Sequence, residues 1–491
     1  MAAGLGTRMK SKKAKVLHQL DGRPLVNHVV EAALALDPNS VCVIVGHQAE
    51  EVKAAVNAEF ADERVCFAIQ EKQLGTGDAI NATRELYEDR DSTVVVLTGD
   101  VPLITSETIR SLIDHHKGEE AAATLLAVKL DDPTGYGRVV RENGQFARIV
   151  EQKDATEDER LIEDINAGFY CFDSRKLFAA LGRLGNNNAQ GEYYLTDIPG
   201  IFKSEGEKVS IYVAPDHQEV EGVNDRRQLA ALEQALRDRT VKRLMLESGV
   251  TFVDPSSAYI SSRAVIGRDT VIYQNATVEG STTIGENCVI HPGVRVVNST
   301  IGDGVEVKDN SFVTDSVVGD GCAVGPMAHL RGHAEMVEGS KVGNFVELKK
   351  TKLGRKSKAS HLTYLGDATI GENTNIGAGT ITCNYDGKNK HRTQIGNRVK
   401  IGSDTMLVAP ITVGDGAVTA AGSVATHDIE ADTLVAGVPA KVKKVLSVGG
   451  DRVTPERPPR TKLTPEESVE RTESFGERKE QFIASIKKSK D

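Results

Sequence analysis

A glycine-rich stretch and two cationic side chains open the chain. Residues 1–9 read MAAGLGTRM, and Lys15 follows. Small residues let backbone N–H groups approach phosphate oxygens, while Arg8 and Lys15 add positive charge. The pattern favours a phosphate-binding loop, although a short Gly-x-Gly-x-Arg string also fits an ordinary turn. Such a loop normally follows a buried strand, and none precedes Met1 in this sequence, so we expect a sheet that lacks its first strand.

A carboxylate follows an apolar run further along. Residues 93–97 (TVVVL) resemble a short buried strand, and Asp100 comes three residues after Leu97. In open α/β sheets, ligands lie beyond the carboxyl ends of the strands. Asp100 is therefore a candidate metal ligand at that edge.

Other segments combine glycines or amides with polar side chains: 70–79, 134–138, 151–154, 166–168 and 190–197. Amide groups and a Gly-Thr-Gly turn suit hydrogen bonds to a base edge, and several such loops could converge on one sugar. Each segment alone is more often a plain surface loop.

A second group of polar residues lies in the C-terminal half. His361 and Tyr364 occur with Arg331, Lys349 and Lys390 in a region that is otherwise aliphatic. A lone histidine is usually structural. The accompanying polar and cationic residues favour a functional site around His361.

The elements that position this second group follow from a period of six residues between 260 and 424. Aliphatic residues recur at every sixth position from Ile260 to Val296, and again, after a slip, from Phe312 to Leu348. Neither a helix nor an ordinary strand selects position six. The period predicts a left-handed parallel β-helix of hexapeptide repeats, with about 18 residues in each three-faced coil. Glycine often follows the sixth residue, where we expect a corner with positive φ.

The six-residue pattern breaks at 349–365 and at 383–390. Because insertions leave a solenoid as loops and often carry function, we expect functional loops at both places.

Upstream of the repeat, apolar strands such as 41–45 and 93–97 alternate with helices, which is typical of a parallel sheet in a Rossmann-like α/β domain. We expect this domain over 1–225, a linker helix over 226–249, the β-helix over 250–445 and a charged, largely disordered tail over 446–491.

Composition excludes several classes of function. The net charge is −10 and no long basic run is present, which argues against a nucleic-acid partner. The six cysteines lack metal-ligand spacing and predict reduced thiols. We find no apolar run that could cross a membrane and no signal peptide, so we expect a cytoplasmic protein.

Five strings carry a close resemblance to a known family: 131–138 (DDPTGYGR), 187–194 (NNAQGEYY), 343–347 (GNFVE), 361–367 (HLTYLGD) and 377–387 (GAGTITCNYDG). Over about residues 1–441, the chain resembles the bacterial bifunctional N-acetylglucosamine-1-phosphate uridyltransferase/glucosamine-1-phosphate N-acetyltransferases. The resemblance implies acetyl transfer from acetyl-CoA to glucosamine 1-phosphate. It further implies Mg²⁺-dependent uridylyl transfer from UTP to N-acetylglucosamine 1-phosphate, in a homotrimer that supplies peptidoglycan and lipopolysaccharide precursors.

The resemblance also assigns residues to the two sites. In the uridylyl site, the resemblance implies that the nucleotide is bound by Ala2, Ala3, Gly4, Gln70, Gly75 and Thr76, and that the sugar is bound by Gly137, Glu151 and Asn166. It implies that Asp100 and Asn224 are Mg²⁺ ligands, with Asn224 also facing the substrate. The catalytic Arg8 and Lys15 would contact the phosphates. In the acetyl site, the resemblance implies that His361 is the catalytic base. Glucosamine 1-phosphate would be bound by Arg331, Lys349, Tyr364, Asn375 and Lys390, and acetyl-CoA by Ala378, Asn384, Tyr385, Ser403 and Ala421.

The sequence departs from the family at two places. The first strand is absent, and Gly437 stands where the family often has an arginine for the CoA phosphates, with Lys441 as a possible substitute. Three alternatives therefore remain open: an enzyme with only the acetyltransferase active, a sugar nucleotidyltransferase with a regulatory β-helix, and a non-catalytic scaffold.

Overall fold

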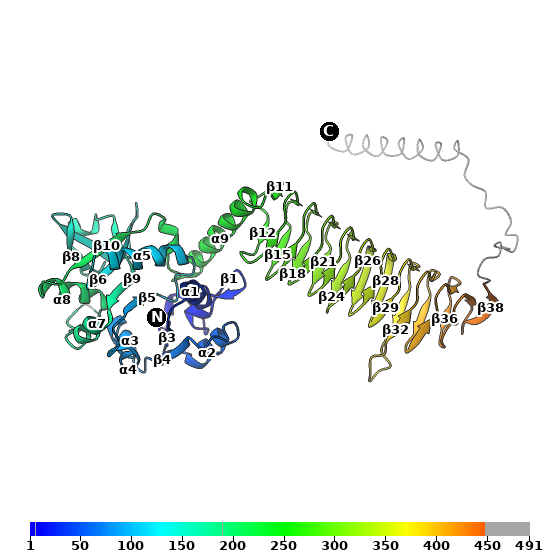
Figure 1. Cartoon of the computed structure of the whole chain (residues 1–491), viewed down its shortest axis with the longest axis horizontal. Helices are drawn as coiled ribbons and strands as arrows, with labels where there is room; N and C mark the ends of the chain where they lie inside the picture. The colour runs from blue at the N-terminus through cyan, green and yellow to red at the C-terminus, as the bar shows by residue number, and fades with distance from the viewer. Residues whose placement is uncertain (5, 189, 447–491) are drawn as a thin grey trace, which may run out of the picture. The chain divides into compact units, whose positions relative to one another are not determined.

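The computed structural model describes residues 1–446 apart from residues 5 and 189, and Met1–Lys443 form one compact unit. Figure 1 labels the α/β part, which precedes α9, and the stacked coils from β11 onward, which we call the solenoid. The tail expected over 446–491 lies outside the described residues beyond Leu446.

Two separate sheets form the α/β part. The strands β3 (Val41–Val45) and β4 (Val65–Ile69) make a parallel pair. A six-stranded sheet has the order β10-β6-β9-β7-β8, with β5 (Thr93–Val96) also paired to β9 (Asp164–Asp173). Its other strands are β6 (Ala123–Lys129), β7 (Arg138–Glu142), β8 (Gln145–Val150) and β10 (Val209–Val213), and a short hairpin joins β1 (Gln19–Leu20) to β2 (Arg23–Pro24).

The α/β fold is the expected one, although its sheets combine parallel and antiparallel strands. The apolar strands β3 and β5 have the predicted positions, but β9 runs antiparallel to β5, β6 and β7. The residues of β9 are buried almost throughout, so its composition resembles that of a parallel core strand and does not reveal its direction.

Helices and 3₁₀ turns connect the strands of the α/β part. They are η1 (Thr7–Met9), η2 (Lys15–Leu17), α1 (Leu25–Leu34), α2 (Ala49–Asn57), α3 (Thr76–Asn81), α4 (Arg84–Tyr87), α5 (Ser106–Gly118), α6 (Glu157–Arg160), α7 (Ser174–Leu181), η3 (Leu195–Asp197), α8 (Ile198–Ser204) and η4 (His217–Val220).

The helix α9 (Arg226–Leu246) matches the predicted linker helix. The Asp225 carboxylate caps its first turn by accepting from the backbone N–H groups of Arg227 and Gln228. Leu232 and Leu244 are buried, and Gly249 follows the helix with a φ of +69°. A left-handed glycine of this kind commonly ends a helix.

Between β3 and β5 lies the very start of the chain. The Met1 amino group donates to Leu97 O at 2.7 Å, and Ala2 N donates to Ile44 O at 2.8 Å. Gly99 N in turn donates to Met1 O at 2.8 Å. Residues 1 and 2 thus join the carboxyl ends of both strands, while no described strand lies alongside the rest of their facing edges.

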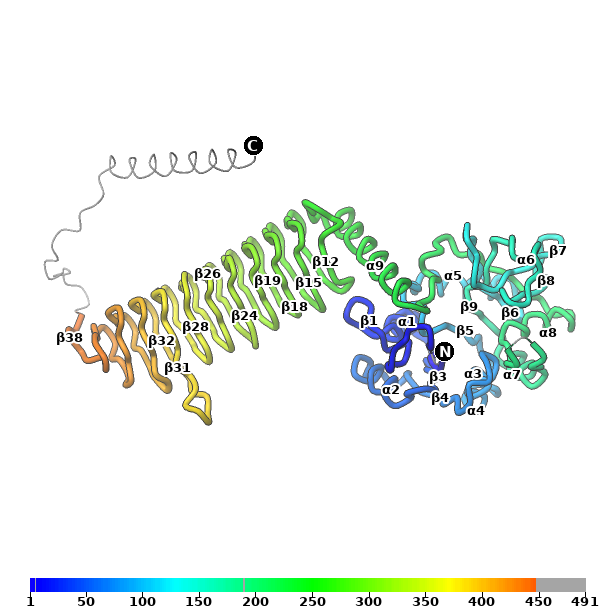
Figure 2. Tube along the Cα trace, turned by 180° about the vertical axis from the view of Figure 1, so that it is seen from behind, coloured from blue at the N-terminus to red at the C-terminus, as the bar shows by residue number. Residues whose placement is uncertain are grey.

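Three faces of short parallel strands make the solenoid (Figure 2). One face is β13-β16-β19-β22-β25-β27-β29-β32-β34, and the long strands β26 and β28 join the other two. The residues that point inward, such as Ile266, Ile284 and Val318, form one continuous apolar core. The predicted parallel β-solenoid is confirmed.

The solenoid strands have these bounds: β11 (Thr251–Phe252), β12 (Tyr259–Ile260), β13 (Val265–Ile266), β14 (Val271–Ile272), β15 (Thr277–Glu279), β16 (Thr283–Ile284), β17 (Val289–Ile290), β18 (Arg295–Val297), β19 (Thr300–Ile301), β20 (Glu306–Val307), β21 (Phe312–Thr314), β22 (Val317–Val318), β23 (Ala323–Val324), β24 (His329–Arg331), β25 (Glu335–Met336), β26 (Lys341–Lys349), β27 (Lys352–Leu353), β28 (Lys358–Gly366), β29 (Ala368–Ile370), β30 (Asn375–Ile376), β31 (Ile381–Cys383), β32 (Thr393–Ile395), β33 (Met406–Val408), β34 (Ile411–Val413), β35 (Val418–Thr419), β36 (Val424–Ala425), β37 (Thr433–Ala436) and β38 (Lys441–Val445).

Coil length varies more than the sequence predicts. Val271 pairs in register with Val289, whereas Thr283 pairs with Thr300, so the second of these coils is shorter by a single position. Because shorter coils shift the inward position along the chain, the count of six places Phe312 inside the solenoid. In the structure Val313 is buried there instead, and Phe312 is 45% exposed. The placement of Phe312 is therefore wrong.

The two breaks in the repeat differ in kind. Across 349–365 the coil keeps a constant length, since Lys341 pairs with Lys358 and Lys358 with Asn375 at equal spacing, so the expected insertion there is wrong. At the second break Thr369 pairs with Gln394, a longer step along the chain than the one from Lys352 to Thr369. The extra residues leave the coil after β31 as a protruding loop, visible in Figure 2, which confirms the second insertion.

The corner glycines also have a different cause from the one expected. Gly267, Gly285 and Gly302 do not have positive φ. A Cβ at Gly267 would lie 2.7 Å from the Gly285 carbonyl carbon, and one at Gly285 would meet the backbone of Gly302 at 2.8 Å. Close approach of successive coils, and not left-handed backbone, therefore requires glycine at these corners.

Candidate active sites

Four polar side chains from distant segments meet in the α/β part. Arg8 Nη2 donates to Asn224 Oδ1 at 2.8 Å, and Lys15 Nζ donates to the same oxygen at 3.3 Å. Lys15 Nζ also forms an ion pair with the Asp100 carboxylate. The structure therefore brings together Arg8, Lys15, Asp100 and Asn224, the four residues that the resemblance assigns to the metal and the phosphates. Their roles stay predictions.

Backbone contacts hold this cluster in place. Val223 N donates to Asp100 O at 2.8 Å, which fixes the loop after β5 against the segment before α9. Gly6 has a φ of +60°, and a Cβ there would lie 2.5 Å from Lys15 Cβ. Glycine at this position thus lets the loop turn and lets Lys15 reach the cluster.

The same cluster has the chemistry of a cation site. The Lys15 ammonium already contacts oxygens of both Asp100 and Asn224, so these two oxygens converge on one positive charge. Carboxylate and amide oxygens are ligands that Mg²⁺ accepts, together with substrate phosphates and water. The donor set therefore fits Mg²⁺, although no group of three or more His, Cys, Asp or Glu side chains arranged for a metal occurs among the residues that the structure describes.

Gln70, Gly75 and Thr76, which the resemblance assigns to the nucleotide, lie around the start of α3. Gln70 is buried, and its amide donates to Gly75 O at 3.0 Å and to Asp78 Oδ2 at 2.8 Å. Gly75 has a φ of +118°, and Thr76 Oγ1 accepts from Leu195 N at 3.0 Å. These bonds fix the turn that begins α3.

The alanines at the start of the chain are buried, and the glycine after them is open. Ala2 and Ala3 pack below the loop, whereas a Cβ on Gly4 would meet nothing within 4 Å. Open space beside a backbone N–H is what a phosphate-binding loop requires.

The three predicted sugar-binding residues lie together. Asn166 N donates to Gly137 O at 2.8 Å, and a Cβ on Gly137 would lie 3.4 Å from Glu151 Oε1. Glu151 also lines a cavity of about 300 Å³ with Asp154 and Asp197. Burial raises the pKa of Glu151, and the charges of Asp154 and Asp197 raise it further. The family resemblance did not single out Asp154 or Asp197, because only the fold brings them to Glu151.

In the solenoid, the candidate base lies on a ladder with three residues of the predicted acetyl-CoA site. Asn344 pairs in register with His361 on the next coil. Hydrogen bonds from Gly379 N to Leu362 O, Asp404 N to Ala378 O and Gly422 N to Ser403 O continue the stack. The ladder is therefore Asn344, His361, Ala378, Ser403 and Ala421, one residue per coil.

The ladder also orients the imidazole. His361 Nδ1 and Asn344 Oδ1 are 2.5 Å apart. An amide oxygen can only accept, so Nδ1 carries the hydrogen and Nε2 presents a lone pair. Sequence reasoning missed Asn344, although its separation from His361 by the length of one coil could have revealed it.

The cationic residues of the predicted acetyl site lie on neighbouring coils of the solenoid. Arg331 pairs in register with Lys349, and the guanidinium of Arg331 is bound by Glu347 at 2.5 Å. Lys349 lowers the pKa of Lys390 through a direct contact and through its positive charge. Two ammonium groups this close suit a phosphate, whose negative charge would relieve their repulsion. Glu347 is a second residue that sequence reasoning missed.

Tyr364 and the protruding loop complete this region. A Cβ on Gly366 would lie 2.3 Å from the Tyr364 hydroxyl and 2.7 Å from Asn384 Nδ2, so both side chains cover the glycine. Asn384 Nδ2 donates to Asp367 Oδ2 at 2.6 Å, while Tyr385 is exposed. The loop thus meets the coil that carries Tyr364.

Asn375 stands apart from these cations. It pairs with Lys358 and Lys400 on a different ladder, and among the described residues no hydrogen bond joins it to Lys349 or Tyr364. Gly437 has a φ of +105°, where an L side chain is strained, and Lys441 is exposed in β38. The replacement of the family arginine by Lys441 stays a prediction.

Comparison with known families agrees with the two folds. Residues 1–250 match the model of a MobA-like NTP transferase domain, residues 257–343 a GMPPB C-terminal domain, and residues 392–427 a hexapeptide repeat of succinyl-transferase. A bifunctional protein GlmU from Exiguobacterium sp. (strain ATCC BAA-1283 / AT1b) is 49% identical over 435 residues, 88% of this chain and 95% of the relative. A bifunctional protein GlmU from Trichlorobacter lovleyi is 46% identical over 445 residues, which cover 90% of this chain and 96% of the relative.

The folds and sites together define a nucleotidyltransferase joined to a hexapeptide-repeat acyltransferase. The chain belongs to the bifunctional GlmU family, and it is an enzyme with uridylyltransferase and acetyltransferase activities. None of these observations favours an enzyme with the acetyltransferase alone. Within the part of the chain that the structure describes, no helix has the length and apolarity to cross a bilayer.

Proposed function

We propose that the chain makes UDP-N-acetylglucosamine in two steps, with acetyl transfer in the solenoid first and uridylyl transfer in the α/β part second. The observation that carries the proposal is the ladder on which His361 stacks with Ala378, Ser403 and Ala421. It aligns a base with the residues that we assign to acetyl-CoA. We assign the α/β domain to residues 1–225, the linker to 226–249, the acetyltransferase domain to 250–445 and a charged tail to 446–491.

For acetyl transfer, Arg331, Lys349 and Lys390 hold the phosphate of glucosamine 1-phosphate. His361 Nε2 takes a proton from the substrate ammonium, and the free amine attacks the thioester carbonyl. A C–N bond forms and the C–S bond breaks. The imidazolium returns its proton to the CoA thiolate, and the nitrogen, now part of the amide, releases its second proton to solvent. Tyr364 or a backbone N–H stabilises the oxyanion, so no covalent enzyme intermediate is required.

The acetyl site also draws on a neighbouring subunit in this proposal. Asn375 lies on a ladder away from Lys349 and Tyr364, so a second copy of the chain would bring it to the substrate. Phe345 and Leu362, beside Asn344 and His361, are 55% and 61% exposed and offer apolar surface for such a contact. We infer a homotrimer, which sedimentation equilibrium would test.

For uridylyl transfer, a phosphate oxygen of N-acetylglucosamine 1-phosphate attacks the α-phosphorus of UTP, and the bond to pyrophosphate breaks. Ala2, Ala3, Gly4, Gln70, Gly75 and Thr76 position the nucleotide, and Gly137, Glu151 and Asn166 position the sugar. Arg8 and Lys15 neutralise charge on the phosphates. Asp100 and Asn224 would hold Mg²⁺, which supplies further positive charge when it is bound.

Two assays on one purified protein test the proposal. Acetyl-CoA with glucosamine 1-phosphate should release free CoA thiol, and UTP with N-acetylglucosamine 1-phosphate should release pyrophosphate. With both co-substrates, glucosamine 1-phosphate should be converted to UDP-N-acetylglucosamine. Direct uridylylation of glucosamine 1-phosphate at an equal rate would overturn the proposed order of the steps. UTP and acetyl-CoA are cytoplasmic metabolites, so we place the enzyme in the cytoplasm.

A further inference from the structure

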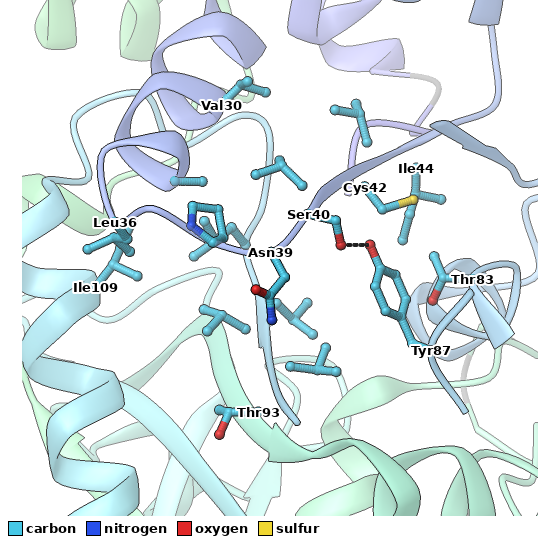
Figure 3. A pocket seen from close by; sticks show the side chains of 18 of the residues that line it. Val30, Leu36, Asn39, Ser40, Cys42, Ile44, Thr83, Tyr87, Thr93 and Ile109 are labelled. Atoms are coloured by element: carbon cyan, nitrogen blue, oxygen red, sulfur yellow. Dashed lines mark hydrogen bonds between the residues drawn. The ribbon is translucent and has the colours of Figure 1, made fainter. Parts of the chain in front are cut away.

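Two cavities of the α/β part differ in their lining. Figure 3 shows the larger of the two, about 620 Å³, which is lined mainly by apolar residues such as Val30 and Ile109. Of the described residues that line it, none is one of the three that we assign to the sugar. Glu151 lines the other cavity, of about 300 Å³. The segments that carry Gly137 and Glu151 are both held by one buried side chain, that of Arg138.

The guanidinium of Arg138 joins three separate segments of the chain. Arg138 begins β7 and is 1% exposed. Its Nη1 donates to Tyr136 O, whereas its Nη2 donates to Gln152 Oε1 at 2.8 Å and to Arg160 O at 3.3 Å. Gln152 Oε1 also accepts from Gly135 N at 3.1 Å. The planar fork of one arginine thus connects the loop before β7, the turn after β8 and the end of α6.

Two of these contacts lie directly beside residues that we assign to the sugar. Tyr136 precedes Gly137, and Gln152 follows Glu151. The two sugar residues face each other, since a Cβ on Gly137 would lie 3.4 Å from Glu151 Oε1. The hydrogen bonds from Arg138 therefore set the separation between these two walls of the sugar site.

The charge of Arg138 is buried among neutral groups. Each of its three acceptors is a carbonyl or amide oxygen, and its Nε is buried without an acceptor among the described residues. A charge that leaves water without a carboxylate beside it costs stability, and a hydrophobic residue of similar size is often more favourable at such a position. Packing alone therefore does not account for an arginine here, whereas charge-assisted bonds to three segments do.

We propose, building on the proposed function that assigns Gly137, Glu151 and Asn166 to the sugar, that Arg138 is a positioning residue for uridylyl transfer. It holds the walls at Gly137 and Glu151 at the separation that N-acetylglucosamine 1-phosphate requires. Because its guanidinium is closed off from solvent, Arg138 acts through these residues and does not touch the substrate. Binding of the sugar phosphate then depends on Arg138. Binding of UTP does not, because the acceptors of Arg138 lie outside the nucleotide segment 70–76.

Arg138→Lys tests this role, because lysine keeps the positive charge but cannot donate to three segments at once. We expect KM for N-acetylglucosamine 1-phosphate to rise at least about fivefold, since charge-assisted bonds that hold the two walls are lost. KM for UTP and the rate of acetyl transfer should not change. Arg141→Lys, on the same strand, is the matched control. It should keep both KM values, because a lysine can still pair with Asp164.

Gln152 provides a second measurement. Gln152→Leu removes the acceptor that Arg138 shares with Gly135 N, and by itself it should raise KM for the sugar phosphate. Because the two side chains act through one contact, the double variant should raise this KM little beyond Arg138→Lys alone. Hydrogen exchange of the amides in 135–137 and 151–153 should quicken in each variant, while the amides of β9 stay slow.

Asn166→Ala tests the sugar site itself. If it raises KM for the sugar phosphate and Arg138→Lys does not, the positioning role of Arg138 is wrong and the sugar site stands. If neither variant raises it, the proposed sugar site is wrong, and the role of Arg138 is wrong with it.

Two further results would overturn the proposal. Equal rises in KM for UTP and for the sugar phosphate, or a parallel loss of acetyl transfer, would show that Arg138 only supports the fold. If Arg138→Lys does not fold, Gln152→Leu decides alone, and an unchanged KM for the sugar phosphate in that variant would rule out the positioning role.

Discussion

The two sites of this enzyme are assembled in opposite ways. In the α/β part, Arg8 and Asn224 meet from positions 216 residues apart, and side-chain contacts join them to Lys15 and Asp100. In the solenoid, a backbone ladder stacks Asn344, His361 and Ala378 at intervals of one coil. The first site therefore depends on the fold as a whole, whereas the second depends on local register.

This difference predicts how each site tolerates change. A ladder site is held by the backbone of its neighbours, so removal of one side chain should leave the others in place. The α/β cluster shares its charges, so removal of one member should disturb the rest. Each of the following experiments tests one side of this comparison.

The largest effect should come from Asp100→Ala. Loss of the carboxylate removes a proposed metal ligand and leaves Lys15 without its ion-pair partner. We expect pyrophosphate release to fall at least about 1,000-fold, since a bound metal contributes several kcal/mol to stabilising the transition state. Acetyl transfer should stay within about twofold. Parallel loss of both activities would contradict the division into two sites.

His361→Ala should affect only the other activity. Without the general base we expect acetyl transfer to fall by about 10²–10⁴-fold. Circular dichroism and uridylyl transfer should be unchanged, because the ladder is held by backbone bonds. His427→Ala, at another exposed histidine of the solenoid, is the matched control and should keep full activity. Near-normal acetylation by His361→Ala would rule out this residue as the base.

Asn344 should act through His361 alone. Asn344→Ala removes the acceptor for Nδ1, and we expect kcat for acetyl transfer to fall about 10–100-fold, with KM for glucosamine 1-phosphate little changed. Asn344→Asp keeps an acceptor for Nδ1, so its rate should recover partly. A rise in KM without these changes would indicate a structural role instead.

The smallest effect should be a pH shift in phosphate binding. Lys349 lowers the pKa of Lys390, so Lys390 loses its positive charge at a lower pH than an isolated lysine does. Affinity for glucosamine 1-phosphate should therefore fall as pH rises through that pKa. In Lys349→Gln the pKa of Lys390 returns upward, and the alkaline loss of affinity should move to higher pH although overall binding is weaker. The affinity for glucosamine 1-phosphate is measured by calorimetry across the alkaline pH range. If it falls at the same pH in Lys349→Gln as in the parent enzyme, the two lysines do not share the phosphate.

Some features of the solenoid could be read from the sequence, and others could not. The aliphatic period indicated the parallel coils because every inward side chain must fill the same narrow core. It failed at Phe312, since small changes in coil length leave composition almost unaltered while they move a side chain from inside to outside. It also suggested an insertion across 349–365, where the coil in fact keeps its length.

The sequence by itself determined the two classes of fold, the linker helix α9 and the chemical type of each site. The period of apolar residues and the short sequence motifs depend on neighbours in the chain, so they are visible without coordinates. Only the tertiary structure decided that Lys15 contacts both Asp100 and Asn224, that Asp154 and Asp197 raise the pKa of Glu151, and that β9 runs antiparallel. These contacts join residues far apart in sequence, and chain packing alone brings them together.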